Sequence, residues 1–148
     1  MRWERQIVAG VTIINDAYNA NPVSMAAALR TFAELPVAGG RWLVLAGMLE
    51  LGPSEAQWHR DLGSSLAQGP WDGIITVGSL GAVIAREAVN AGVSAARVFA
   101  CADNGAAAEV LGRCLQPGDA VLLKASRGQR LEQVMALWKS RVTLNQIN

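Results

Sequence analysis

The sequence predicts an α/β fold: a Rossmann-like, doubly wound, mostly parallel sheet of about six strands, with an N-terminal β-hairpin. Two observations predict it. Short apolar runs rich in β-branched residues alternate along the chain with stretches that repeat apolar residues at helical spacing. Capping or helix-breaking residues bound most of the helical stretches. Parallel strands need crossover connections, which helices of roughly 10–15 residues provide.

The first elements are a hairpin and a helix. Two short runs at residues 6–9 and 11–15 flank Gly10 and predict the hairpin. Asn21 and Pro22 have the preferences of an N-cap and a first helical residue. The helix that they open is expected to end at Pro36. The later strands are expected at residues 42–46, 73–77, 97–100 and 120–124.

Helices are expected after each later strand. Ser54 and Gln57 have the spacing of a capping box for a helix that runs to about Ala67, and Asp103 is a typical N-cap. Further helices are predicted at about 81–91 and 103–115, and a last one carries Leu131, Val134, Met135 and Trp138 on one face. We expect one domain over residues 1–141 and a tail at 142–148.

Composition excludes several classes of protein. The 148 residues are 51% hydrophobic and 17% charged, which excludes a disordered chain. A net charge of +1 gives no electrostatic footprint for nucleic acid. His59 is the only histidine and there are two cysteines, so neither a multi-histidine metal site nor a disulfide framework is expected. No apolar run is long enough for a membrane span and no signal peptide is evident, so we expect a cytoplasmic domain.

Ligands of doubly wound sheets bind beyond the carboxyl ends of the strands. In this chain that rule selects residues 15–21, 47–52, 78–81 and 125–128. The first segment holds one carboxylate (Asp16), one phenol (Tyr18) and the amides of Asn15, Asn19 and Asn21. A carboxylate there could accept hydrogen bonds from ribose hydroxyls, and amides could read a base edge. The alternatives are an Asx-turn at Asp16 and an ordinary N-cap at Asn21.

A second polar segment joins the last strand to the last helix. Lys124, Ser126, Arg127 and Arg130 place cations and a hydroxyl where a helix begins. Cations are usually found at the other end of a helix, so the arrangement favours an anion site. The alternative is that Ser126 and Gln129 form a capping box beside solvated arginines.

Residues 47–52 are an apolar loop between two glycines. The loop could approach a ligand closely or be a packed connection, and Glu50 alone favours the packed connection. We expect His59, in the following helix, to pack or form a hydrogen bond rather than act in catalysis.

Three common catalytic or phosphate-binding motifs are absent. The sequence has no Gly-x-x-x-x-Gly-Lys-[Ser/Thr] loop, no Gly-x-Gly-x-x-Gly and no Gly-x-Ser-x-Gly. The chain therefore lacks a phosphate cradle of its own, which indicates a domain that works beside another.

Three segments together resemble the C-terminal domain of the Mur ligases. They are Asp16-Ala17-Tyr18-Asn19-Ala20-Asn21-Pro22, then Met48-Leu49-Glu50-Leu51-Gly52 with His59, and Lys124-Ala125-Ser126-Arg127-Gly128. Their order and placement agree from about residue 2 to residue 138. The Tyr-Asn-Ala-Asn-Pro run resembles most the branch that adds D-alanyl-D-alanine to a UDP-N-acetylmuramoyl tripeptide in peptidoglycan synthesis.

The resemblance implies an ATP-dependent ligase of three domains. The N-terminal domain binds the UDP-sugar peptide, and the central domain carries the P-loop and most contacts to ATP and Mg. ATP phosphorylates the peptide carboxylate, and the amine of D-alanyl-D-alanine then attacks the acyl phosphate. The C-terminal domain closes over ATP and receives the dipeptide. It holds no catalytic residue of its own and is expected to be inactive alone.

The resemblance also implies roles for individual residues. Asp16 would bind the ATP ribose, and the other nucleotide-binding residues would be Arg2, Tyr18, Asn19 and Asn21. Ser126 would hold the dipeptide carboxylate with Lys124 and Arg127 nearby, and Glu50 would also belong to the dipeptide site.

The chain departs from the family pattern at Ala46-Gly47, where other members often carry glycine followed by an acid. This chain therefore offers no carboxylate at that position. Ala125 and Gln129 are milder changes. The alternative function is a free-standing small-ligand-binding or regulatory module on the same fold.

Overall fold

The computed structural model describes residues 3–147, which form one six-stranded sheet in the order β1-β2-β6-β3-β4-β5. Strand β1 is antiparallel to β2, and every other neighbouring pair is parallel. The predicted α/β fold with an N-terminal hairpin is confirmed. The strands are β1 (Glu4–Val8), β2 (Val11–Asp16), β3 (Arg41–Ala46), β4 (Gly73–Val77), β5 (Val98–Cys101) and β6 (Ala120–Lys124).

The hairpin turn explains the glycine at its tip. Ala9 and Gly10 have φ values of 52° and 79°, the double positive φ of a two-residue turn whose twist suits a hairpin. A Cβ on Gly10 would also lie 2.9 Å from Cβ of Pro117. Both backbone conformation and space therefore favour glycine there.

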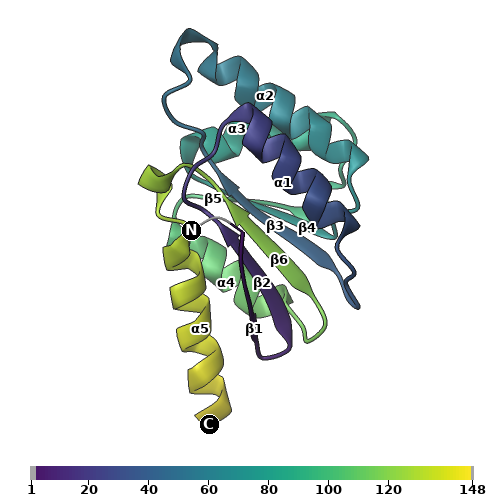
Figure 1. Cartoon of the computed structure of the whole chain (residues 1–148), viewed down its shortest axis with the longest axis vertical. Helices are drawn as coiled ribbons and strands as arrows, with labels where there is room; N and C mark the ends of the chain where they lie inside the picture. The colour runs from purple at the N-terminus through teal and green to yellow at the C-terminus, as the bar shows by residue number, and fades with distance from the viewer. Residues whose placement is uncertain (1–2, 148) are drawn as a thin grey trace.

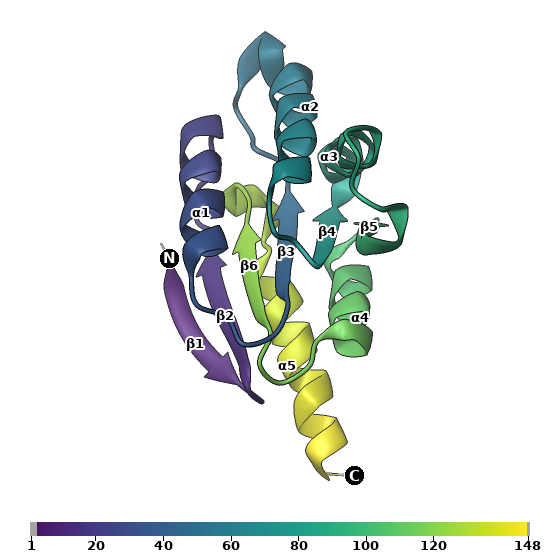
Figure 2. The same ribbon diagram turned by 90° about the vertical axis from the view of Figure 1, so that its right-hand side faces the viewer.

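Helices cover both faces of the sheet (Figures 1 and 2). Helices α1, α2 and α3 pack on one face, and α4 and α5 pack on the other. Neighbouring strand residues point to opposite faces: Ile14 and Leu122 face α1–α3, whereas Ile13 and Val121 face α4 and α5. The helices are α1 (Pro22–Glu34), α2 (Glu55–Ser65), α3 (Gly78–Asn90), α4 (Asn104–Cys114) and α5 (Glu132–Ile147).

Each layer has its own buried cluster. On the α1–α3 side, Phe32 stacks on Trp71 with ring centroids 5.9 Å apart. On the other side, the predicted apolar face of the last helix is buried as expected, with all four of its residues at 3% exposure or less. The sheet thus sits between two apolar layers, and Figure 2 shows β2, β6, β3 and β4 pointing toward the same end.

Three element boundaries differ from the prediction. The capping box at Ser54 is wrong: the chain enters α2 through a 3₁₀ turn, Gly52–Ser54, and the Ser54 side chain makes no capping bond. Helix α3 begins at Gly78, three residues early, so residues 78–81 are its first turn rather than a loop. Helix α5 continues past Arg141 to Ile147, through most of the predicted tail. Among the described residues, no helix is both long enough and apolar enough to cross a bilayer.

Candidate functional site

Asp16 and Lys124 meet at the carboxyl ends of two paired strands. They are register partners in β2 and β6, and the Lys124 ammonium lies 2.8 Å from Oδ2 of Asp16. The ammonium also donates to the carbonyl of Asn19 at 3.0 Å. The Lys124 side chain is only 2% exposed and that of Asp16 is 15% exposed. The first and second predicted polar segments are therefore joined by a buried ion pair.

The second carboxylate oxygen of Asp16 has a partner as well. Oδ1 accepts the backbone N–H of Trp3 at 3.2 Å. The Asx-turn considered for Asp16 is instead made by its neighbour, since Oδ1 of Asn15 accepts the N–H of Ala17 at 3.2 Å. The capping alternative for Asn21 is confirmed, because its Oδ1 accepts from Ser24 at 2.8 Å and Ser24 returns the bond in a capping box.

Tyr18 and Arg127 form a second link between the same two segments. The guanidinium carbon of Arg127 lies 5.3 Å from the centre of the Tyr18 ring, a cation–π distance. Both side chains are exposed, as is Asn19. They form the outer part of the cluster, above the buried ion pair.

Ser126 joins the second polar segment to a third segment, residues 47–52. Its Oγ accepts the backbone N–H of Leu49 at 2.8 Å and lies 3.4 Å from the carbonyl of Ala20. The 3₁₀ turn Arg127–Gln129 that follows has no side-chain cap, so the capping box considered as the alternative for Ser126 and Gln129 is not formed. The hydroxyl is used to connect loops rather than to cap its own turn.

The third segment is packed at its start and exposed at its middle. A Cβ on Gly47 would lie 2.7 Å from Cδ1 of Leu80, so Gly47 serves close packing. Met48 is buried, and its N–H donates to Nε2 of His59 at 2.9 Å. Glu50 is exposed and has a φ of +62°. The expectation that His59 forms a hydrogen bond is confirmed.

The structure brings most predicted site residues to one edge of the sheet. Lys124 joins Asp16 to the Asn19 carbonyl, and Ser126 is bonded to Leu49 on the adjoining loop. Tyr18, Arg127 and Glu50 stand exposed on the same loops. Arg2 lies outside the described residues. Asn21 follows directly, but its side-chain oxygen is engaged in capping.

Sequence reasoning missed Trp3. The backbone N–H of Trp3 donates to Asp16. Trp3 also lines a groove of about 340 Å³ together with Asp16, Ser24, Ala27, Ala28 and Thr31. The hairpin register pairs Glu4 with Asn15 and so sets Trp3 beside Asp16. The sequence predicted the hairpin without its register, and register was the signal that could have found Trp3.

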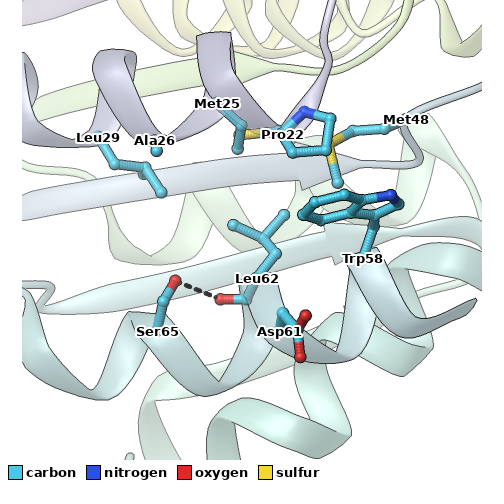
Figure 3. Close-up of a pocket in the computed structure, with 9 residues that line it drawn as sticks. All are labelled: Pro22, Met25, Ala26, Leu29, Met48, Trp58, Asp61, Leu62 and Ser65. Atoms are coloured by element: carbon cyan, nitrogen blue, oxygen red, sulfur yellow. Dashed lines mark hydrogen bonds between the residues drawn. The ribbon is translucent and has the colours of Figure 1, made fainter. Parts of the chain in front are cut away.

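A smaller cleft of about 170 Å³ lies between α1 and α2 (Figure 3). Figure 3 shows the Trp58 ring next to Met48 and Pro22, above Leu62. Pro22 follows the first site loop and Met48 belongs to the third, so the cleft adjoins the site, but its walls are mainly apolar.

No metal site is evident in the described part of the chain, where no three His, Cys, Asp or Glu side chains gather around a common point. The groups available for a ligand at this edge are the ion-paired carboxylate of Asp16, the exposed amide and phenol of Asn19 and Tyr18, the Arg127 guanidinium and the Ser126 hydroxyl. They suit hydrogen bonding to a sugar hydroxyl and binding of a carboxylate.

The chain is similar to proteins of one enzyme family. The family described as "Mur ligase, glutamate ligase domain" matches residues 1–127. The UDP-N-acetylmuramoyl-tripeptide–D-alanyl-D-alanine ligase of Bacillus subtilis is 38% identical over 127 residues, which are 86% of this chain and 28% of that protein. The ligase of the same name from Mycobacterium tuberculosis is 38% identical over 143 residues, covering 84% of this chain and 28% of that protein.

Solved structures agree. The MurF ligase of Thermotoga maritima in complex with ADP superposes with a TM-score of 0.81 at 25% identity, over 97% of this chain and 31% of that one. MurF from Acinetobacter baumannii gives 0.83 at 31% identity, over 94% of this chain and 30% of that one. The chain spans less than a third of the length of each of these relatives.

Proposed function

The chain belongs to the Mur ligase C-terminal domain family, and we propose that it supplies one wall of the ATP and D-alanyl-D-alanine sites of a peptidoglycan-precursor ligase. The relatives named above are about three times as long as this chain. We infer that N-terminal and central domains of the same ligase provide the UDP-N-acetylmuramoyl tripeptide site and the phosphate cradle.

One observation carries the proposal. Asp16 and Lys124 come from segments 108 residues apart, one expected to bind nucleotide and the other the dipeptide, and their side chains form a 2.8 Å ion pair. A single sheet edge therefore presents both segments. An enzyme that joins two substrates needs their sites side by side, because holding reactants together is a large part of catalysis.

The nucleotide side centres on Asp16. A carboxylate at this edge can accept hydrogen bonds from the two ribose hydroxyls. Exposed Tyr18 and Asn19, with Asn21 and Arg2, complete the proposed set. The ADP named with the Thermotoga maritima structure supports nucleotide use by this family.

The dipeptide side centres on Ser126 and Arg127. The guanidinium of Arg127 can pair with a carboxylate through two parallel bonds, and the Ser126 hydroxyl can add a third. Glu50 is exposed on the adjoining loop and could bind the dipeptide ammonium. Lys124 is too buried to be the outermost cation, so we infer that it contributes by holding Asp16 and the Asn19 carbonyl in place.

The proposed reaction is amide-bond formation in two steps. The tripeptide carboxylate takes the terminal phosphoryl group of ATP and releases ADP. The amine of D-alanyl-D-alanine then attacks the acyl carbon and expels phosphate. Residues of this chain bind and orient the partners, and we assign none of them a catalytic step. Magnesium would be held by the central domain, since the described residues offer it no ligand cluster. We therefore expect the isolated chain to be inactive.

Steady-state kinetics of the complete ligase test the residue roles. Asp16→Ala should lower kcat/KM for ATP by the equivalent of about 1–3 kcal/mol, the usual cost of losing a charged hydrogen-bond partner. Ser126→Ala should act mainly on KM for D-alanyl-D-alanine. Arg86→Ala, a change of an exposed side chain on α3, serves as the control. Unchanged kinetics in both site variants would overturn the residue assignment.

Calorimetry distinguishes this proposal from a free-standing ligand-binding module. We expect ATP and D-alanyl-D-alanine to bind the 148-residue chain weakly, because half of each site is missing. Binding of either with micromolar or better affinity by the chain alone would favour the free-standing module. Reconstitution with the other two domains should restore dipeptide-dependent phosphate release.

A further inference from the structure

His59 is a buried polar side chain for which the proposed function has no use. It is completely buried in α2, yet both ring nitrogens have partners. Nδ1 lies 2.7 Å from the carbonyl of Glu55, one turn earlier, and Nε2 lies 2.9 Å from the backbone nitrogen of Met48. A buried imidazole with two specific partners is more than a filler of apolar space.

The two partners fix the tautomer of the ring. A backbone N–H can only donate, so Nε2 must be the bare, accepting nitrogen. A carbonyl can only accept, so Nδ1 must carry the hydrogen. His59 therefore connects α2 to the start of the third site loop as a neutral Nδ1–H imidazole.

The next residue extends the connection to the dipeptide side. Leu49 donates its N–H to Oγ of Ser126 at 2.8 Å. Because this oxygen already accepts a hydrogen bond, the hydroxyl hydrogen is directed elsewhere. The nearest acceptor given by the structure, the Ala20 carbonyl, is 3.4 Å away, which is long for O–H···O. A ligand carboxylate at normal distance would be a better acceptor for that hydrogen.

The residue after Leu49 shows why the loop needs support. Glu50 holds a φ of +62°, an uncommon value for a residue with a side chain, which persists only where the surroundings enforce it. The neighbouring loop is tight as well: Ser126 donates its N–H to Gly47 at 3.1 Å, and a Cβ on Gly128 would lie 3.0 Å from Cδ1 of Leu49.

We propose that His59 is a positioning residue: its imidazole holds the N–H of Met48, in the Gly47–Met48 peptide. It thereby holds the next peptide, whose Leu49 N–H orients the Ser126 hydroxyl, and the backbone of Glu50 that follows. The effect on the dipeptide rests on the proposed function. The effect on the loop does not, so the two can be tested separately.

Two variants of similar size separate the acceptor from the rest of the ring. In His59→Gln, the side-chain amide oxygen can reach the position of Nε2 and accept from Met48. In His59→Asn, the shorter side chain can replace only Nδ1. Amide hydrogen exchange, measured by NMR on the 148-residue chain, should be about tenfold faster at Met48 and Leu49 in His59→Asn, which corresponds to one lost hydrogen bond. His59→Gln should stay near the wild-type rates. Equal rates in both variants would overturn the proposal.

Kinetics of the complete ligase then test the link to the dipeptide. His59→Asn should raise KM for D-alanyl-D-alanine and leave KM for ATP unchanged, with His59→Gln restoring the value. A merely structural loss would lower the active fraction, and thus kcat, without this selectivity. A faster-exchanging loop with an unchanged dipeptide KM would keep the positioning role and contradict the proposed dipeptide site.

A measurement on the wild type covers the case in which the variants do not fold. Long-range ¹H–¹⁵N correlation spectra of the imidazole distinguish its tautomers. At neutral pH we expect the hydrogen on Nδ1 and a bare Nε2. An Nε2–H tautomer or a doubly protonated ring would overturn the proposal without any substitution.

Discussion

Lys124 and Asp16 are unequal partners in their ion pair. The lysine side chain is 2% exposed and the aspartate side chain 15%, and only the aspartate also accepts a backbone N–H from Trp3. A buried charge that loses its partner is costly, whereas replacing both members with neutral groups is often close to neutral. The contribution of the pair to stability therefore depends mainly on whether the buried Lys124 ammonium keeps its counter-charge.

This asymmetry predicts an order of stabilities. Asp16→Asn should lower the free energy of unfolding by about 3 kcal/mol, because it leaves the Lys124 ammonium buried without a counter-charge. Lys124→Met should cost less, since Asp16 is partly exposed and keeps the Trp3 bond. The double variant should be more stable than Asp16→Asn alone. Urea unfolding of all three measures the coupling, and strictly additive losses would contradict it.

The sequence predicted which residues gather at the site better than what each side chain does there. Asp16, Ser126 and Lys124 stand at strand ends, and chain order alone brings them to one edge. That Lys124 pairs with Asp16 depends on β2 lying next to β6, a contact across 108 residues that no local spacing encodes. The hydrogen bond from the Leu49 N–H to Ser126 depends likewise on β3 lying on the other side of β6.

Cys101, away from the site, predicts a pH dependence. Burial raises the pKa of its thiol above the ordinary value of 9.0, and the nearby Asp103 carboxylate adds to the rise. Folding therefore favours the protonated thiol, so its contribution to stability is complete below about pH 9 and is lost as the pH rises through the raised pKa. Between pH 8 and pH 10, the wild type should lose more unfolding free energy than Cys101→Ala does. Parallel losses in urea melts of the two proteins would refute this.

At the level of elements, the close contact of α2 with α3 depends on a glycine. A Cβ at Gly63 would lie 2.5 Å from the Ile84 carbonyl oxygen and 2.8 Å from Cβ of Glu87. Backbone cannot move aside as a flexible side chain does, so α2 and α3 would have to separate. Because α2 also carries His59, this spacing bears on the third site loop.

Gly63→Ala should therefore destabilise the protein, although alanine is the better helix former by about 1 kcal/mol. Gly112→Ala in α4 is the matched control, since its nearest neighbour would be Cδ of Arg141 at an ordinary 3.8 Å. The control should gain up to about 1 kcal/mol of stability from helix propensity alone. Thermal unfolding of both variants checks the opposite signs, and a stabilised Gly63→Ala would show that the α2–α3 spacing is adjustable.

The sequence predicted the start of a helix correctly where a single capping residue determines it. Asn21 with Pro22 and Asp103 begin their helices as expected, because a cap needs only its own side chain and the next turn. Ser54 failed as a cap because it already belongs to the 3₁₀ turn Gly52–Ser54, with a ψ of 7°. Helix α3 starts early without any side-chain cap at Val77, so no cap residue marked its beginning.

On the scale of the whole molecule, the two apolar layers share a single sheet. Each buried strand gives alternate side chains to each layer, as Leu43 and Val44 do in β3. Neither layer can lose its packing without exposing one face of the strands on which the other layer also packs. The described part of the chain should therefore unfold in one step, as small domains usually do.

Phe32→Ala tests this coupling between the layers. Phe32 is completely buried and stacks on Trp71, so the substitution should cost about 3–5 kcal/mol. Trp138 lies in the opposite layer, and its signal should nevertheless report the same lowered urea midpoint as the far-ultraviolet circular dichroism. ¹⁹F NMR of fluorotryptophan-labelled protein resolves Trp138 from the other four tryptophans once Trp138→Phe assigns its resonance. If that resonance kept its native shift at urea concentrations that unfold α1, the layers would be independent. A shared midpoint would mean that the loops at the site edge are held by both layers at once.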